Sequence, residues 1–153
     1  MECSDESRKS MIEIVLILQL VSTFAMTGII WFVQIVHYPL FGKVGAASFL
    51  DYEQSHLHRT TIVVAPLMLT EAITSLVLLW ICPVTIPLEA VVAGVLLVLL
   101  VWASTFFTQV PIHGKLSKSF DAVTHRRLVQ WNWVRTIGWS ARSVLSCWIC
   151  VYR

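Results

Sequence analysis

The stretch LVQWNWVRTIGWSARSVLSCWICVY, residues 128–152, decides the fold because it is apolar enough to cross a bilayer yet contains two arginines. A charged side chain at the middle of a membrane-spanning helix costs roughly 2.5–3.5 kcal/mol on insertion scales. Arg135 and Arg142 are seven residues apart, which places them on one face of a helix. We therefore expect this face to turn away from lipid, toward helices that supply polar partners.

The composition of the whole chain is that of a membrane protein. Of the 153 residues, 57% are hydrophobic and 13% are charged, whereas soluble proteins contain about 25% charged residues. A soluble protein of this size needs far more polar surface to cover its core. The net charge of +2 is too small to indicate nucleic-acid binding, which requires a concentrated basic face. The lipid bilayer is therefore the first predicted partner.

Four segments are long enough to cross a hydrocarbon core, which requires about 20 helical residues. The predicted spans cover residues 11–36, 60–82, 87–110 and 128–152. This pattern predicts an all-α fold with a single membrane domain, residues 1–153, built as a four-transmembrane-helix bundle. Six Lys and Arg residues lie on the side of the two long loops, against three near the termini. By the positive-inside rule, the long loops are cytoplasmic and the termini lie outside.

Two parts of the sequence resemble each other and indicate a duplicated two-helix unit. Gln34-Ile-Val-His37 ends the first predicted span, and Gln109-Val-Pro-Ile-His113 ends the third. Each is followed by a lysine, then by Ser-Phe, then by histidine and arginine just before the next span. Duplication would give parallel repeats related by an axis along the membrane normal, with a ligand site between the halves. The match is short and gapped, so a bundle without duplication is the alternative.

The polar residues of each predicted span fall on one helical face, which predicts a shared polar interior. Glu71 lies ~16 Å into its span and Arg142 ~21 Å into its own, counted from the same side at 1.5 Å per residue. We therefore expect them to pair near the middle of the bilayer. The pair either supports a functional site or only locks two helices together, because buried ion pairs can specify packing without chemistry. The other predicted substrate-binding or supporting residues are Gln34, Gln109, Tyr52 and Trp139.

All five histidines fall on the side of the long loops. Imidazole is the commonest metal ligand in proteins and also ligates haem. The group therefore indicates either a layer of hydrogen-bonded interfacial residues or a site for a metal ion or haem. The spacing matches no recognised metal-binding motif. The candidate metal ligands are His37, His56, His58, His113 and His125.

The strongest candidate for chemistry is Arg135, which is shallower than Arg142 and close to the histidine layer. The predicted catalytic residues are His37, His113, Asn132 and Arg135. Tyrosines and tryptophans at the same level form either an interfacial belt or the walls of a site for a flat lipophilic molecule such as a quinone. Arg135 and Asn132 would then hydrogen-bond a carbonyl or phenolate, an arrangement that suits redox or proton-transfer chemistry.

Two motifs resemble a known family. The motifs are Gln109-Val-Pro-Ile-His-Gly-Lys-Leu116, at the end of the third predicted span, and Trp131-Asn-Trp-Val-Arg-Thr136 in the fourth. They resemble small four-helix membrane proteins grouped with the fungal anthrone oxygenases, over about a third of the chain. The resemblance implies an oxygenase-like role. His113 stands where asparagine is expected in that family, and the His-Leu-His-Arg of residues 56–59 is not typical of it.

Three functional hypotheses follow from these features. The first is a membrane-bound oxidoreductase that acts on a lipophilic substrate or holds a metal ion or haem. The second is a small transporter or proton-conducting protein, in which Glu71, Arg142 and the histidines form a relay. The third is a non-catalytic membrane subunit, alone or in an oligomer, whose polar seam only holds helices together.

Overall fold

The computed structural model describes residues 2–45, 47–81 and 83–152, which are helical over most of their length and contain no strand. The predicted all-α class is therefore confirmed. The elements along the chain are α1 (Glu2–Phe32), a π-helical turn η1 (Val33–His37), α2 (Tyr38–Phe41), α3 (Phe49–Ile81), α4 (Leu88–Ser104), a second π-helical turn η2 (Thr105–Gln109), α5 (Val110–Leu116) and α6 (Ala122–Tyr152).

Three segments of the described chain are long and apolar enough to cross a membrane: Glu6–Phe41, Phe49–Ile81 and Leu88–Leu116. They contain most of the first three predicted spans and extend beyond them; for example, α3 begins at Phe49, well before the predicted span that starts at residue 60. α6 has 31 residues but is not among these three segments, and its composition is more polar. The structure therefore supports the membrane class with three apolar helices.

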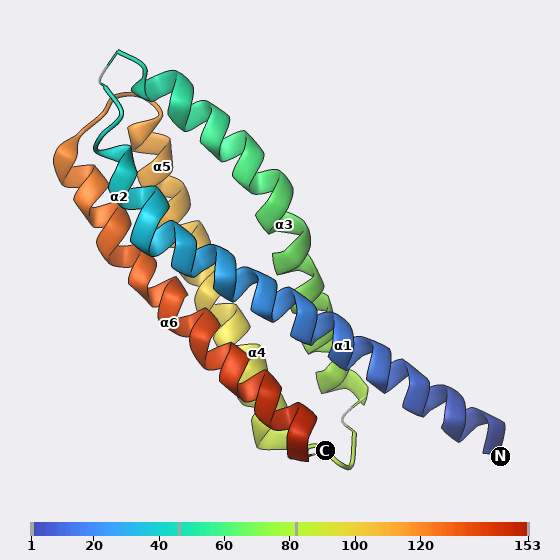
Figure 1. The fold of residues 1–153 in the computed structure, drawn as a ribbon. Helices are drawn as coiled ribbons and strands as arrows, with labels where there is room; N and C mark the ends of the chain where they lie inside the picture. Colours follow the sequence, from blue (N-terminus) through green and yellow to red (C-terminus); the bar gives the residue numbers. More distant parts are fainter. Residues whose placement is uncertain (1, 46, 82, 153) are drawn as a thin grey trace.

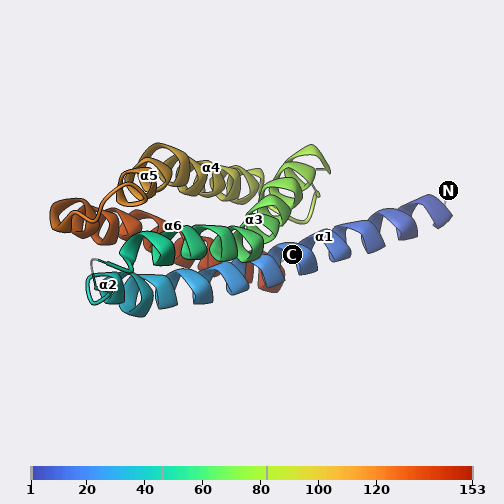
Figure 2. The same cartoon turned by 90° about the horizontal axis from the view of Figure 1, so that it is seen from above.

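The long helices pack side by side as a bundle (Figures 1 and 2). α1 packs against α3 and α6, and α4 also packs against α3 and α6. The chain alternates in direction, so the two termini lie at one end of the bundle and the two longer connections at the other (Figure 1). The first turns of α1 extend past the other helices. This arrangement brings the ends of α2, α3, α5 and α6 together beneath the longer connections.

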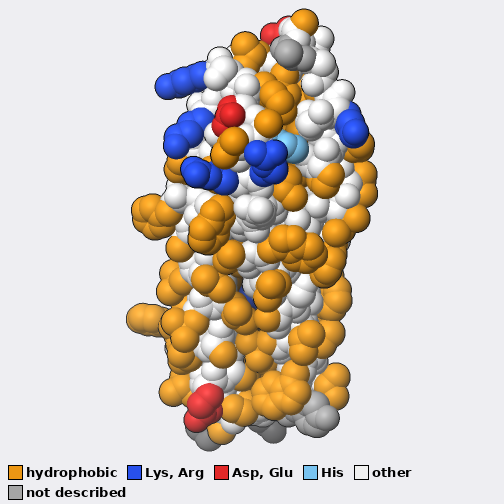
Figure 3. Space-filling model, turned by 90° about the vertical axis from the view of Figure 1, so that its left-hand side faces the viewer, with side chains coloured by type: hydrophobic (Ala, Val, Ile, Leu, Met, Phe, Trp, Pro, Cys, Tyr) orange, Lys and Arg blue, Asp and Glu red, His pale blue; other side chains and the backbone are white. Residues whose placement is uncertain are grey.

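The face shown in Figure 3 is apolar over most of its height, while lysines and arginines gather toward the end with the longer connections. Large hydrophobic side chains are exposed on every long helix, for example Ile17, Ile73, Leu96 and Val144. In contrast, charged side chains such as Glu71 and Arg142 are fully buried. An apolar exterior around a polar interior is the arrangement that a lipid-facing bundle requires.

The core consists of three hydrophobic clusters at different heights. One includes Ile149 near the termini, one includes Trp139 at mid-height, and one includes Phe41 beneath the longer connections. Polar side chains are interspersed among them. The interior therefore alternates between apolar layers, which hold the helices together, and polar layers, which need internal partners.

Both π-helical turns lie just before a proline, 72 residues apart in the chain. Pro39 follows η1 and Pro111 follows η2. Proline has no N–H to donate, so the backbone carbonyl one turn earlier loses its regular hydrogen-bond partner. The helix widens locally into a π turn there. The wider turns set the direction in which the residues after them point, and these residues contribute to the polar site described next.

Candidate functional site

His113 is the centre of a polar site beneath the longer connections. It lies on α5, its Nδ1 is 2.5 Å from Glu53 Oε1, and its Nε2 is 2.9 Å from the Tyr38 hydroxyl. All three side chains are buried. Because the carboxylate accepts the Nδ1 proton, Nε2 is the acceptor and the Tyr38 hydroxyl donates to it. Glu53, His113 and Tyr38 thus form a chain of three groups, each able to pass on a proton.

A second pair of imidazoles lies toward the outside of the bundle. His37 Nε2 is 2.8 Å from His56 Nδ1, and the Thr60 hydroxyl is 3.0 Å from the same His56 nitrogen. His56 is buried, whereas His37 is half-exposed. The rings of His56 and His113 have centroids 5.5 Å apart. His56 therefore stands between the half-exposed His37 and the buried chain that begins at Glu53.

Arg135 is a buried cation at this site. Its Nη1 donates to Asn132 Oδ1 at 3.3 Å, and its guanidinium also lies near the Tyr38 hydroxyl. Neither of the two side-chain ion pairs in the described part of the chain involves Arg135. Its Nε has no hydrogen-bond partner. A buried guanidinium with unused donor capacity is suited to an oxygen atom of a bound molecule.

A cavity of about 270 Å³ lies beside these groups, between α3 and α5. Its walls are formed by Tyr38, His56, Leu57, Thr60, Thr61, Gln109, Val110, His113, Gly114 and Arg135. Both amide atoms of the buried Gln109 lack hydrogen-bond partners, as does Glu53 Oε2. Buried polar atoms normally have partners, and although others without one lie elsewhere in the bundle, the Gln109 amide and Arg135 Nε line this cavity together, which indicates a place for a polar ligand atom or water.

The predicted glutamine and asparagine residues form the support of this site. Asn132 Nδ2 donates to Gln34 Oε1 at 2.9 Å, and Gln34 Nε2 donates to the Val129 carbonyl at 3.2 Å. The amide oxygen of Asn132 is thereby turned toward Arg135. The structure thus places His113, Asn132 and Arg135 in one polar region and holds His37 one step farther out.

Glu71 and Arg142 pair in the middle of the bundle, as predicted from their depth. Arg142 Nε donates to Glu71 Oε2 at 2.6 Å, and its Nη2 donates to the Ser75 hydroxyl at 2.5 Å. The Ser22 hydroxyl reaches Glu71 Oε1 at 3.4 Å. Gly94 allows the guanidinium to lie against α4, because a Cβ at that position would be 2.7 Å from Arg142 Nη1. Ser22, Ser75 and Gly94 thus surround the ion pair.

The other predicted supporting residues lie near these two polar layers. Tyr52 is half-buried and packs edge-on against Phe41, with ring centroids 5.4 Å apart. Trp139 is buried at mid-height, where its carbonyl accepts a hydrogen bond from Thr27. Neither lines the cavity beside His113. Trp139 belongs to the apolar cluster at mid-height, and Tyr52 packs against the cluster that includes Phe41.

The predicted metal site is not supported by the arrangement of the histidines. In the described ranges, no group of three or more His, Cys, Asp or Glu side chains is placed to hold a metal ion. His37 and His56 share a hydrogen bond through their ring nitrogens, and His113 Nε2 bonds the Tyr38 hydroxyl. His125 Nε2 is 2.7 Å from the Tyr38 carbonyl. His58 is exposed. Four of the five imidazoles therefore act as hydrogen-bonding residues in this structure, and the fifth, His58, lies at the surface.

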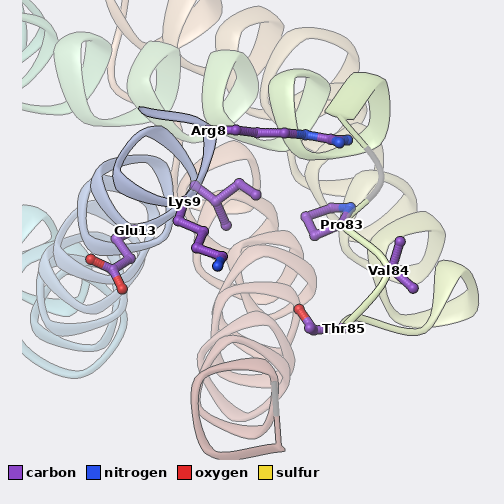
Figure 4. A pocket seen from close by; sticks show the side chains of 7 residues that line it. Arg8, Lys9, Glu13, Pro83, Val84 and Thr85 are labelled. Carbon is purple, nitrogen blue, oxygen red and sulfur yellow. The ribbon is translucent and has the colours of Figure 1, made fainter. Parts of the chain in front are cut away.

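Two larger hollows lie elsewhere. One of about 410 Å³ lies on the outer side of His56, next to Tyr52 and Arg59. The other, of about 340 Å³, lies at the opposite end of the bundle, between the start of α1 and the turn after α3 (Figure 4). Its charged side chains, including Arg8 and Glu13, are exposed to the outside. Neither hollow shows the unpartnered buried polar atoms found beside His113.

Sequence reasoning missed Glu53, which anchors His113. Glu53 precedes His56 by three residues and Thr60 by seven, so all three lie on one helical face. That spacing was the available signal, but Glu53 lies before the predicted span of residues 60–82 and was therefore not predicted to be part of a membrane-spanning helix. No family model, curated protein or solved structure matches the chain, so its function has to be inferred from the geometry of this site.

Proposed function

We propose that this chain is a four-span membrane protein that binds a lipophilic, oxygen-bearing molecule beside His113 and carries out oxidoreductase-like, proton-coupled chemistry on it. The observation that carries the proposal is Arg135, a buried cation without a carboxylate partner next to a cavity. Leaving a buried donor unpaired costs ~1–3 kcal/mol, and more for a charged group. A ligand oxygen would remove that cost.

α6 serves as the fourth span in this proposal. Its low mean hydropathy is caused in part by residues that face inward, because Asn132, Arg135 and Arg142 are all buried. Arg126 and Arg127 are exposed at its first turns, but beyond residue 130 its exposed side chains are apolar, including Ile137 and Val144. A helix with this division can cross a bilayer when its polar face is covered by neighbouring helices. The excess of lysine and arginine on the long connections supports a cytoplasmic location for that end.

A duplicated two-helix unit is also part of the proposal. Each half contains a long helix, a π-helical turn, a short helix and a second long helix. Pro39-Leu-Phe-Gly-Lys43 and Pro111-Ile-His-Gly-Lys115 align without a gap at the same 72-residue offset as the π turns. In this alignment His113 stands at the position of Phe41, so only the second half supplies the central imidazole.

The ligand is best matched by a molecule with a carbonyl or phenolic oxygen. Arg135 Nε and the Gln109 amide are the unused donors of the site. The adjoining cavity is near the lower end of the range of ~300–1,000 Å³ that small-molecule pockets occupy. A rigid, mostly apolar body with one polar end would satisfy the donors and still dissolve in the bilayer.

Tyr38 is the group placed to exchange a proton with such a ligand. Its hydroxyl proton points to His113 Nε2, and its oxygen faces the Arg135 guanidinium. When Tyr38 takes a proton from the ligand, its own proton passes to His113, and Glu53 stabilises the resulting imidazolium. The proton gained by His113 balances the one lost by the ligand. The resemblance of residues 109–116 and 131–136 to the anthrone-oxygenase-like proteins favours an oxygenase-like reaction after this step.

The test uses the whole chain in lipid nanodiscs with a fluorinated naphthol, observed by fluorine NMR. Arg135→Gln is expected to weaken binding by about tenfold or more, since a hydrogen bond to a charged donor contributes ~1.5–3 kcal/mol. The matched control is Arg127→Gln, an exposed arginine of the same helix. Equal affinities of Arg135→Gln and wild-type protein, with both fully helical, would overturn the binding proposal.

The chemistry is tested separately by dissolved-oxygen uptake with an oxidisable polycyclic phenol. Tyr38→Phe removes only the hydroxyl and is expected to abolish protein-dependent uptake while naphthol binding stays within about threefold of wild type. Uptake by Tyr38→Phe at the wild-type rate would exclude the proposed role of the hydroxyl. If no variant or wild-type protein takes up oxygen, the oxygenase-like reaction is wrong even where binding is retained.

Proton conduction is the second candidate, favoured by the buried charge at two heights. The hollow beside the Glu71–Arg142 pair has a volume of only about 10 Å³, enough for roughly one water molecule. Trp139 and Met26 belong to the apolar cluster at mid-height. A pH-sensitive dye inside liposomes tests this function directly. Proton flux that is lost in Glu71→Gln would favour conduction over the ligand-binding proposal.

A further inference from the structure

We infer that the ligand reaches this site sideways from the bilayer, through an opening between α3 and α5 at Thr61, Val110 and Gly114. The inference rests on the proposed function, because it concerns access to the cavity beside His113. Its walls come from α3 on one side and from η2 and α5 on the other. α3 packs mainly against α1 and α4 and has little contact with α5. The two walls of the cavity are therefore not packed tightly against each other.

The rim of the opening belongs to the lipid-facing surface. Thr61 and Gly114 are exposed, and Val110 is 53% exposed. They lie in two of the segments that are apolar enough to cross a membrane, Phe49–Ile81 and Leu88–Leu116. A side chain added at Gly114 would have no atom within 4 Å of its Cβ. The rim is therefore open and continuous with the apolar exterior.

Polarity increases from the rim to the floor of the cavity. Val110 and Leu57 lie near the outside, whereas the buried Tyr38, Gln109 and Arg135 form the floor. A molecule that enters with its oxygen first places that oxygen among the unused donors and keeps its apolar body at the rim. The site thus selects bilayer-soluble molecules with one polar end, because a second polar group would remain in the apolar rim without a partner.

The alternative entrance from the loop side is closed by hydrogen bonds. His56 and Thr60 line both the cavity and the hollow of about 410 Å³ on the other side. His56 Nδ1 is held by His37 and by the Thr60 hydroxyl, which fixes the ring as a wall between the two spaces. Arg59 lies on the outer side of this wall. A lipophilic molecule that used this route would have to pass a charged mouth and displace the imidazole.

The experiment compares three tryptophan substitutions in nanodiscs, with the association rate of the fluorinated naphthol as the readout. Gly114→Trp places an indole across the bilayer-facing rim, in space that is empty. Ser55→Trp adds the same bulk at the exposed edge of the outer hollow. Gly28→Trp is the control, since Gly28 is exposed on α1 and also has no atom within 4 Å of an added Cβ.

Gly114→Trp is expected to slow association about tenfold, within the range over which mutations change association rates, while the other two variants match wild type. Slower association in Ser55→Trp with no change in Gly114→Trp would show entry from the loop side and overturn the inference. Unchanged rates in all three would also overturn it. In both cases the binding site itself stands if Arg135→Gln still weakens binding of the naphthol, whereas wild-type protein that never binds the naphthol removes the proposed function instead.

Discussion

The two buried arginines of α6 have opposite surroundings, although they are only seven residues apart on one helical face. Arg142 is paired with Glu71, bonded to Ser75 and enclosed by Gly94. Arg135 donates a hydrogen bond to the Asn132 side-chain oxygen and lies near the Tyr38 hydroxyl. Its Nε has no hydrogen-bond partner among the described residues, and a cavity lies beside it. A buried charge whose partners all lie within the protein holds helices together. A buried charge with unused hydrogen-bonding capacity is available to bind a ligand.

The largest expected effect comes from removing each charge in turn. Arg142→Met leaves Glu71 buried and unpaired, which is expected to lower the free energy of unfolding by about 3–5 kcal/mol. Arg135→Met leaves no unpaired carboxylate and removes an uncompensated cation, so it is expected to stay within about 1 kcal/mol of wild type or to be more stable. Unfolding in detergent, followed by circular dichroism, measures both. Equal destabilisation would remove the distinction between the two sites.

The double variant Glu71→Leu with Arg142→Leu sharpens the same comparison. Replacing a buried ion pair by apolar side chains is often neutral or stabilising by ~1–4 kcal/mol, so the double variant is expected to recover most of the stability lost in either single variant. The measurement is a double-mutant cycle of unfolding free energies. A double variant as unstable as Glu71→Leu alone would show that the pair does more than neutralise charge.

Gly94→Ala tests the close approach of α4 to Arg142. Its Cβ would be 2.7 Å from Arg142 Nη1, so the guanidinium must shift, and we expect a loss of about 1–3 kcal/mol. Gly28→Ala is the matched control, because nothing lies within 4 Å of its Cβ and alanine favours a helix by ~1 kcal/mol over glycine. A Gly94→Ala protein as stable as its control would mean that the guanidinium has room to move.

The smallest expected effect lies outside both sites, at the start of α6. The Asp121 carboxylate accepts hydrogen bonds from the Thr124 and Val123 amides, and the bonds to Thr124 hold its pKa below the usual value. Because the folded pKa is lower than the unfolded one, the stabilisation is complete above the ordinary aspartate pKa of about 3.9 and is lost as the pH falls through the folded value. Asp121→Ala is expected to melt slightly below wild type at neutral pH, with the difference shrinking in acid. A constant difference at every pH would contradict this.

The Glu71–Arg142 pair was predictable because it depends only on helical periodicity and depth, which the sequence contains. Glu53 was not, since its role depends on where α3 begins, and element boundaries are set by tertiary packing. The metal prediction stays a prediction, because residue type indicates what an imidazole is able to bind, whereas the position of its partners decides what it does bind; among the described residues no group of three or more ligand side chains is placed around one point. α6 shows the same limit for hydropathy, because an average over a span does not record which residues face inward.

The direction in which the His113 side chain points depends on the number of residues in the π-helical turn η2. Each residue of a regular helix turns the next by about 100°, and a π turn accommodates one residue more than a regular turn. A chain lacking one residue within Thr105–Gln109 would still form a long apolar helix, but its imidazole would be rotated away from the Glu53 carboxylate. Single-residue deletions here would therefore separate insertion into the membrane, which depends on hydropathy, from assembly of the proton-transfer chain, which depends on angular register.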